Sequence, residues 1–315
     1  MIKDIAIKPL LVLTITVLLG ACVNVNESGM DENGVIRFIT SARSRAAVNG
    51  SSLPNGSSFY VWGYRTPMDG GTVLTDFNKE TVTREGGIWS YTGGTRYWFS
   101  GYVYNFYAVY PSESINVSCT SEGNIAVTDF DATQGIDLMT ASHTDIQVSG
   151  SNIPDAVVFN FQHLLAKIQF VAKSEGGNAT VDSIELSGIS TSGNYVESEN
   201  PIWNDLQEGI ISVKKTTTVT TSENTDVSGD LLLIPQMLEK PVITVTYSTE
   251  VEKNKKVTYS LPVDVITQWS AAQAYRYTFT ITGGGYIIFD VPTVNPWNEA
   301  SGGNVIIDVT QQSDT

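Results

Sequence analysis

Residues 157–173, VVFNFQHLLAKIQFVAK, decide how this chain is organised. Apolar and polar residues alternate along much of the stretch, which is the pattern of a strand with one buried face. The stretch is long for one strand, because about five or six residues is usual. We therefore predict two strands that meet near Gln162 and His163, the last of one domain and the first of the next. The predicted domains are residues 35–162 and 163–315.

Alternating stretches recur on both sides of this segment and are bounded by Gly, Pro, Asn and Ser. The main ones are residues 58–64, 103–110, 125–128, 181–186, 210–213, 231–234, 242–248, 256–262, 275–281, 286–291 and 304–310. No segment has convincing 3.6-residue apolar periodicity, although a short helical turn is predicted at 270–274. Short strands at this spacing predict an all-β chain built of β-sandwiches.

The N-terminal segment predicts export from the cytoplasm. Lys3 and Lys8 precede an apolar run, 9–21, that is shorter than the about 20 residues of a membrane span but suits a signal peptide. The small pair before Cys22 resembles the lipobox of bacterial lipoproteins, in which the peptide is cut before the cysteine and the thiol carries diacylglycerol. We predict a signal peptide at 1–21, lipidation of Cys22 and a lipid anchor in the outer membrane. The alternative is an ordinary secretory signal with an incidental cysteine.

The chain is strongly acidic, with 18 Lys and Arg against 33 Asp and Glu and a net charge of −15. Loss of residues 1–21 would remove two lysines and one aspartate and leave −16. Such a surface repels nucleic acid and anionic lipid headgroups, so neither is an expected partner. With Cys22 lipidated, Cys119 has no disulfide partner and is predicted to be a small buried apolar residue.

The segment after the cysteine predicts a strand followed by a processing site. Residues 22–34 are polar and acidic and form a predicted flexible tether. Residues 35–41 form a predicted strand in which Ile36, Phe38 and Thr40 share one face. Arg43 and Arg45 follow among small residues, a setting in which proteases cut. The alternative is that both arginines are solvated loop charges.

Nothing in the sequence predicts an enzyme, a cofactor or a metal site. The two histidines are twenty residues apart, and no CxxC, HExxH, GxSxG or phosphate-loop motif is present. Asp129, Asp131 and Asp137 lack the spacing of a calcium loop and are predicted to be solvated. His163 is predicted to pack or hydrogen bond at the domain junction, since no carboxylate or second histidine stands near it in sequence.

Several segments together resemble the fimbrillin family of Bacteroidetes, the pilins of type V pili. They are, in order, FYVWGY (59–64), YW (97–98), NFYAVYP (105–111), DLMTA (137–141), FQHLLAKI (161–168), LLIPQ (232–236) and WSAAQAYRYT (269–278). The resemblance runs from the lipobox to the C-terminus. One departure lies in the last segment, where the family pattern W-x-A-G-x-x-Y has glycine and this chain has Ala272.

The resemblance implies a fold, a partner and a mechanism. The fold is two tandem transthyretin-like β-sandwiches, and the partners are other pilin subunits. A protease of trypsin-like specificity cuts after an arginine, here Arg43 or Arg45, and removes the first strand. A strand of the next subunit then enters the open groove by β-strand addition. The candidate donor is residues 304–310, in which Val305, Ile307 and Val309 form one apolar face.

Other functions stay open at this point. The chain is alternatively a monomeric surface lipoprotein that binds host or bacterial glycans, because six tryptophans are available for stacking on sugars. Trp62, Trp98 and Trp269 fall in family segments and are predicted to be buried, whereas Trp89, Trp203 and Trp297 are freer to be exposed. Within a pilus, the chain is predicted to be a stalk subunit, with tip and anchor subunits as alternatives.

Overall fold

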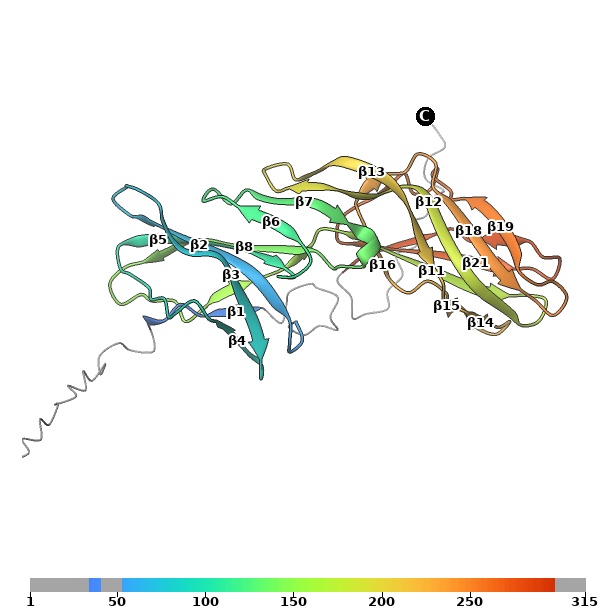
Figure 1. Ribbon diagram of the computed structural model, residues 1–315, viewed down its shortest axis with the longest axis horizontal. Helices are drawn as coiled ribbons and strands as arrows, with labels where there is room; N and C mark the ends of the chain where they lie inside the picture. Colours follow the sequence, from blue (N-terminus) through green and yellow to red (C-terminus); the bar gives the residue numbers. More distant parts are fainter. Residues whose placement is uncertain (1–33, 41–52, 298–315) are drawn as a thin grey trace, which may run out of the picture. The chain divides into compact units, whose positions relative to one another are not determined.

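The structure, a computed structural model, describes residues 34–40 and 53–297. Within these residues every regular element is a β-strand except one 3-10 turn, η2 (Ala132–Gln134). In the same part of the chain, no helix is long and apolar enough to cross a membrane. The strands form sheets that pack over two apolar cores, which confirms the predicted all-β, sandwich-like fold (Figure 1).

The first large sheet has six antiparallel strands in the order β10-β8-β5-β2-β3-β4. Their bounds are β2 (Ser58–Pro67), β3 (Leu74–Glu85), β4 (Ile88–Tyr91), β5 (Tyr102–Tyr110), β8 (Met139–Val148) and β10 (Gln162–His163). Its central strands β2 and β5 are buried on both faces. Phe59 and Phe106 enter the first core, while Trp62 and Tyr107 join the second.

A small parallel sheet closes the first core on the other side. It pairs β1 (Phe38–Thr40) with β9 (Val157–Phe159), two strands far apart in sequence. The first core is rich in aromatic rings and draws on β1, β2, β3, β5, β8 and β9.

Two further sheets enclose the second core. One contains β11 (Ala166–Ser174), β15 (Thr225–Asp226), β16 (Leu231–Leu233), β21 (Gln273–Ile281), β22 (Ile287–Phe289) and β23 (Thr293–Pro296). The other contains β6 (Asn116–Cys119), β7 (Ile125–Asp131), β12 (Ala179–Val196), β13 (Ile202–Val213), β14 (Thr217–Val219), β18 (Val242–Ser248) and β19 (Lys255–Ser260). A short pair, β17 (Gln236–Met237) with β20 (Gln268–Trp269), completes the set.

The second core collects side chains from both sides of residue 163. β7 pairs with β12, and Val127 and Phe130 lie in the same cluster as Ile184 and Tyr195. Strands of the predicted first domain therefore pair with strands of the predicted second one. The boundary at residue 163 stays a prediction.

Three local predictions need correction. Residues 157–173 form parts of three strands, β9, β10 and β11, and not two, because the chain leaves the ladder twice between Phe159 and Ala166. Residues 270–274 contain a turn followed by the start of β21, with no helical turn. Cys119 is only half-buried.

Candidate functional site

The first described segment, residues 34–40, is hydrogen bonded by two different segments, one along each of its halves. The backbone of Ile36 donates to Arg96 O at 2.8 Å, and Trp98 N donates to Gly34 O at 2.8 Å. Further along, Val157 N donates to Arg37 O at 2.7 Å, and β1 then runs parallel to β9 with Phe38 opposite Val157. The slot that holds residues 34–40 is thus built by residues 96–98, which bond to residues 34–36, and by β9, which bonds to Arg37 and β1.

Phe38 fills an aromatic pocket in the first core. Its side chain is 2% exposed, and its ring lies 5.1–6.5 Å from five other ring centroids. The five are those of Phe59, Phe77, Tyr91, Phe106 and Phe159. Gly63 leaves room for this arrangement, because a Cβ there would lie 2.7 Å from the rings of Phe77 and Phe106.

The other side chains of the segment follow the predicted alternation. Ile36 is fully buried beside Phe38, whereas Ile39 points outward and is 46% exposed. Thr40 is half-buried, and its Oγ1 has no hydrogen-bond partner among the described residues. The predicted shared face of Ile36, Phe38 and Thr40 is therefore present, and its first two members are the ones that enter the core.

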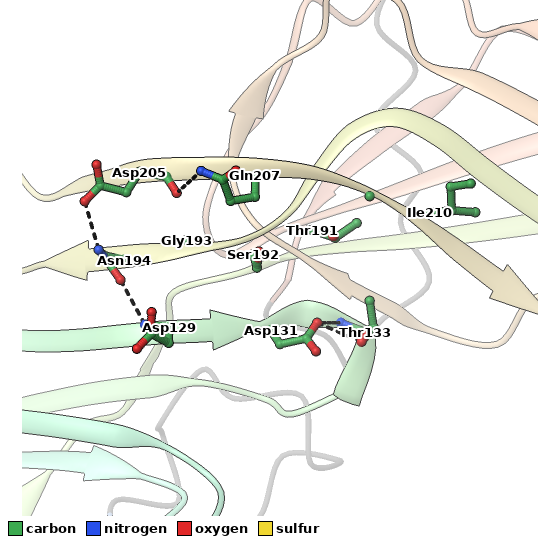
Figure 2. A pocket seen from close by; sticks show the side chains of 11 residues that line it. Asp129, Asp131, Thr133, Thr191, Ser192, Gly193, Asn194, Asp205, Gln207 and Ile210 are labelled. Atoms are coloured by element: carbon green, nitrogen blue, oxygen red, sulfur yellow. Dashed lines mark hydrogen bonds between the residues drawn. The ribbon is translucent and has the colours of Figure 1, made fainter.

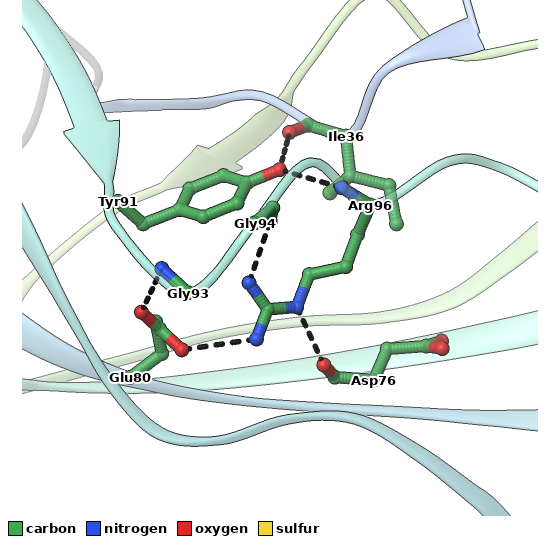
Figure 3. Close-up of polar contacts among 7 residues, drawn as sticks. All are labelled: Ile36, Asp76, Glu80, Tyr91, Gly93, Gly94 and Arg96. Atoms are coloured by element: carbon green, nitrogen blue, oxygen red, sulfur yellow. Dashed lines mark hydrogen bonds and ion pairs between the residues drawn. The ribbon is translucent and has the colours of Figure 1, made fainter.

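A polar cluster fixes the backbone of Ile36 (Figure 3). Tyr91 Oη donates to Ile36 O at 2.9 Å and accepts from Arg96 N at 3.3 Å. Arg96 is held in turn by Glu80 Oε2 at 3.0 Å and by the carbonyl oxygens of Asp76 and Gly94. Its guanidinium also lies 4.6 Å from the centre of the Phe77 ring. Burial raises the pKa of the Tyr91 phenol above its usual value, so the hydroxyl stays a donor at neutral pH.

The sequence did not point to Tyr91 or Arg96, which are far from residue 36 along the chain. Both sit beside the Gly93-Gly94 turn, whose close backbone approach lets Gly93 N donate to Glu80 Oε1 at 2.9 Å. An arginine and a tyrosine next to paired glycines is too common a pattern to identify such a cluster in advance.

The other predicted site residues lie outside the described part of the chain. These are Cys22, Arg43, Arg45, Val305, Ile307 and Val309. Lipidation, processing and the donor strand therefore stay predictions.

At its far end the described chain is anchored beside the junction of β10 and β11. The Trp297 ring stacks on His163 at 3.6 Å with an interplanar angle of 11°, and His163 Nδ1 lies 2.7 Å from Asp137 Oδ1. Trp297 N donates to Ala272 O at 2.7 Å. His163 is a packing and hydrogen-bonding residue as predicted, but a carboxylate does lie beside it. Trp297 was predicted to be free for exposure and is 2% exposed, because it caps this junction.

A polar cavity of about 610 Å³ lies between β7 and the β12–β13 pair (Figure 2). Asn194 bridges its two walls, since its Nδ2 donates to Asp205 Oδ2 at 2.9 Å and its Oδ1 accepts from Asp129 N at 2.8 Å. Asp131 caps η2 by accepting from Thr133 N at 2.9 Å. Among the described residues, no group of three or more His, Cys, Asp and Glu side chains is arranged to hold a metal ion.

Comparison with solved structures shows the same fold in Bacteroides proteins. A fimbrial protein from Bacteroides vulgatus matches with a TM-score of 0.58 at 18% identity, over 84% of this chain and 99% of that one. A candidate cell adhesion protein from Bacteroides uniformis matches with a TM-score of 0.50 at 18% identity, over the same shares. A third, from Bacteroides ovatus, has a TM-score of 0.54 at 16% identity, over 84% of this chain and 96% of that one.

A sequence comparison supplies the family. No curated protein matches the chain. The fimbrillin-like family model matches residues 44–297, a span that begins after β1 and ends at Trp297. This match covers most of the chain and agrees with the folds of the solved structures. The chain therefore belongs to the fimbrillin-like family.

Proposed function

We propose that this protein is the precursor of a structural subunit of a type V pilus and that it assembles by exchange of β1. The subunit is exported as a lipoprotein through Cys22, anchored in the outer membrane and then cut after Arg43 or Arg45. Removal of β1 opens a groove that receives the strand 304–310 of another subunit. The observation that carries this proposal is that residues 34–36 bond to residues 96–98 and β1 pairs with β9, with Phe38 inserted among five rings.

An open groove gives the reaction its driving force. Without residues 34–40, the backbone groups of residues 96–98 and of β9 lose partners, and the aromatic pocket is exposed to water. An incoming strand of about seven residues buries three or four aliphatic side chains at about 1.5–3 kcal/mol each, while ordering its backbone costs about 1–2 kcal/mol per residue. Those two contributions roughly cancel. Closure of the exposed groove must therefore provide the net stabilisation.

The donor has the spacing that the groove requires. Val305, Ile307 and Val309 stand at every second position, as do Ile36, Phe38 and Thr40. Strand addition joins two different surfaces of identical subunits, so it need not close and extends into a filament. The uncut β1 inhibits this reaction because a tethered strand competes at high effective concentration.

The site that is cut can be tested with arginine variants in cells. We expect the double variant Arg43→Ala/Arg45→Ala to stay at the surface as a lipidated monomer that starts at Cys22. Arg37→Ala, an exposed arginine in the same segment, is the matched control and should assemble normally. The N-terminus of material sheared from cells, measured by mass spectrometry, should be Ser44 or Ala46 in the parent.

Two outcomes would contradict the proposal. One is a start at Cys22 in every surface form of the parent protein, which would make the chain an anchor subunit or a monomeric surface lipoprotein. The other is undiminished polymer from the double variant.

A further inference from the structure

A second groove lies outside the β1 slot. A cavity of about 450 Å³ opens between the start of β13 and the β17–β20 pair. Its walls include Leu164, Tyr195, Trp203, Met237, Trp269 and Ala271. None of its lining residues is charged, in a chain whose net charge is −15. Met237 is 65% exposed and is the most accessible large apolar side chain of the groove, whose lining also includes the polar residues Gln236, Gln268 and Ser270.

The described chain ends against residues that flank the lining of this groove. Trp297 N is hydrogen bonded to the carbonyl of Ala272, the neighbour of the lining residue Ala271. The Trp297 ring stacks on His163, the neighbour of the lining residue Leu164. Residues 298–315 therefore follow a residue, Trp297, that contacts two immediate sequence neighbours of the groove lining, Ala272 and His163.

The sequence beyond Trp297 has the length and the chemistry to fill the groove. Residues 298–304 are polar or small, and the next apolar run is Val305, Ile306 and Ile307, followed by Val309. The eight-residue step from Trp297 to Val305 reaches at most about 26–29 Å when extended. The uncharged groove, with its apolar and aromatic side chains, suits an aliphatic strand, whose backbone the polar Gln236, Gln268 and Ser270 could bond, and it offers no cation for an acidic or phosphorylated ligand.

We propose that residues 305–309 of the same chain occupy this groove in the unassembled subunit, against Trp203 and Met237. The proposal deepens the proposed function, on which it rests for the identity of the donor strand. A donor held in its own subunit is hidden from water and from other strands until exchange. Tethering favours this occupant over a second copy, because a short tether gives an effective concentration in the millimolar range.

Disulfide trapping tests the contact in the full mature chain. The background carries Cys22→Ser and keeps β1, so assembly does not begin. Met237→Cys with Ile307→Cys is compared with Val251→Cys with Ile307→Cys. Val251 is 92% exposed in the β18–β19 turn and does not line the groove. The native Cys119 interferes little, since burial and the neighbouring Glu197 and Glu122 raise its pKa to about 12.

At micromolar protein, we expect the 237–307 pair to form an intramolecular disulfide at least tenfold faster than the 251–307 pair. Equal rates for the two pairs would overturn the proposal. Disulfides formed only between molecules would also overturn it, in favour of a second copy as the occupant.

A second measurement uses accessibility and does not need a disulfide. In the Met237→Cys chain, Ile307→Asp should release the segment and raise the alkylation rate of residue 237 about tenfold. The matched control Ser301→Asp adds the same charge in the linker and should leave the rate unchanged. An unchanged alkylation rate in both variants would overturn the proposal. So would added glycans that slow alkylation of residue 237 equally with and without Ile307→Asp.

These experiments separate the two proposals. Both use uncut protein, whereas the proposed function is scored by polymer formed after cleavage. If the 237–307 disulfide forms but cleaved protein makes no polymer, only the strand-exchange proposal is contradicted. If polymer forms but the disulfide does not, only the proposal that residues 305–309 occupy the groove is contradicted.

Discussion

The first and last strands of the described chain are held in opposite ways. β1 pairs with β9, a strand far away in sequence, and inserts Phe38 into a ring cluster. β23 pairs only with β21 among the described strands, and β21 is a near neighbour in sequence. Its four residues are half-buried or exposed, and the burial at this end comes from Trp297.

This difference shows which terminal strand is suited to exchange. Removal of residues 34–40 would expose an aromatic core, the edge of β9 and the backbone groups of residues 96–98. Removal of β23 would free only part of one edge of β21, which would stay paired with β11 and β22. The groove left by β1 is therefore the one whose exposed apolar surface and unpaired backbone groups most favour binding of a replacement strand.

The largest expected effect comes from emptying the Phe38 pocket. Phe38→Ala should lower the free energy of unfolding by about 3–5 kcal/mol, because it removes a buried ring and leaves a cavity. Chemical denaturation of the uncut mature chain measures it. The neighbour Ile39→Ala is the control and should cost well under half as much, since Ile39 is 46% exposed. Equal losses for the two variants would mean that β1 is not inserted as described.

The next effect concerns the backbone of β1. Tyr91→Phe removes the donor to Ile36 O and leaves a buried carbonyl unpaired, at a cost of about 1–2 kcal/mol. Burial raises the Tyr91 pKa above 10.0, so the folded state holds this proton more tightly than the unfolded state. The contribution is then complete below pH 10 and falls as the pH rises further. Denaturation at pH 7 and pH 10.5, with Tyr97→Phe as the control, checks both statements.

At the other end of the chain the expected loss is smaller. Trp297→Phe keeps a ring on His163 and removes part of the indole volume, so we expect a loss of about 1 kcal/mol. Trp297 Nε1 has no hydrogen-bond partner among the described residues, and its loss should add little. A loss of unfolding free energy as large as that of Phe38→Ala would mean that the two ends of the described chain contribute equally to stability, which would contradict the comparison. Thermal unfolding of both variants in one buffer gives the comparison.

The smallest effect is a gain. Ala272 has φ of 57°, in the left-handed region that costs an L-residue about 1–2 kcal/mol. Ala272→Gly relieves that strain and loses part of the gain to unfolded-chain entropy, which leaves about 0.5–1 kcal/mol of stabilisation. A lower melting temperature for this variant would refute the explanation. Ala271→Gly, at an exposed neighbour, is the control and should not stabilise.

The strands that sequence predicted are those with regular alternation against a core, such as β2, β5 and β21. β3 escaped prediction because only Phe77 and Val82 are fully buried along it and Lys79, with φ of 54°, breaks the period. β13 was predicted only at 210–213, because most of this strand is exposed and shows no burial period. The family departure at Ala272 was visible in the sequence, and the positive φ explains why glycine is expected there.

Only part of the candidate site could be predicted from the sequence. The shared face of Ile36 and Phe38 follows from alternation, and both residues are buried as that predicts. The partners of β1 do not follow, because β9 and residues 96–98 are joined to it only by tertiary contacts. The parallel register of Phe38 with Val157 has no local signal at all.

The parallel pairing of β1 with β9 also determines how a strand held there responds to force. Ladder hydrogen bonds lie across the strand direction, so tension along the strand loads them in shear and together. A strand peeled from one edge, as in a hairpin, would instead lose its bonds one after another. A strand seated beside β9 and pulled along its length therefore resists with all of its hydrogen bonds at once, and gains a mechanical strength that the same few bonds would not provide if they were peeled singly.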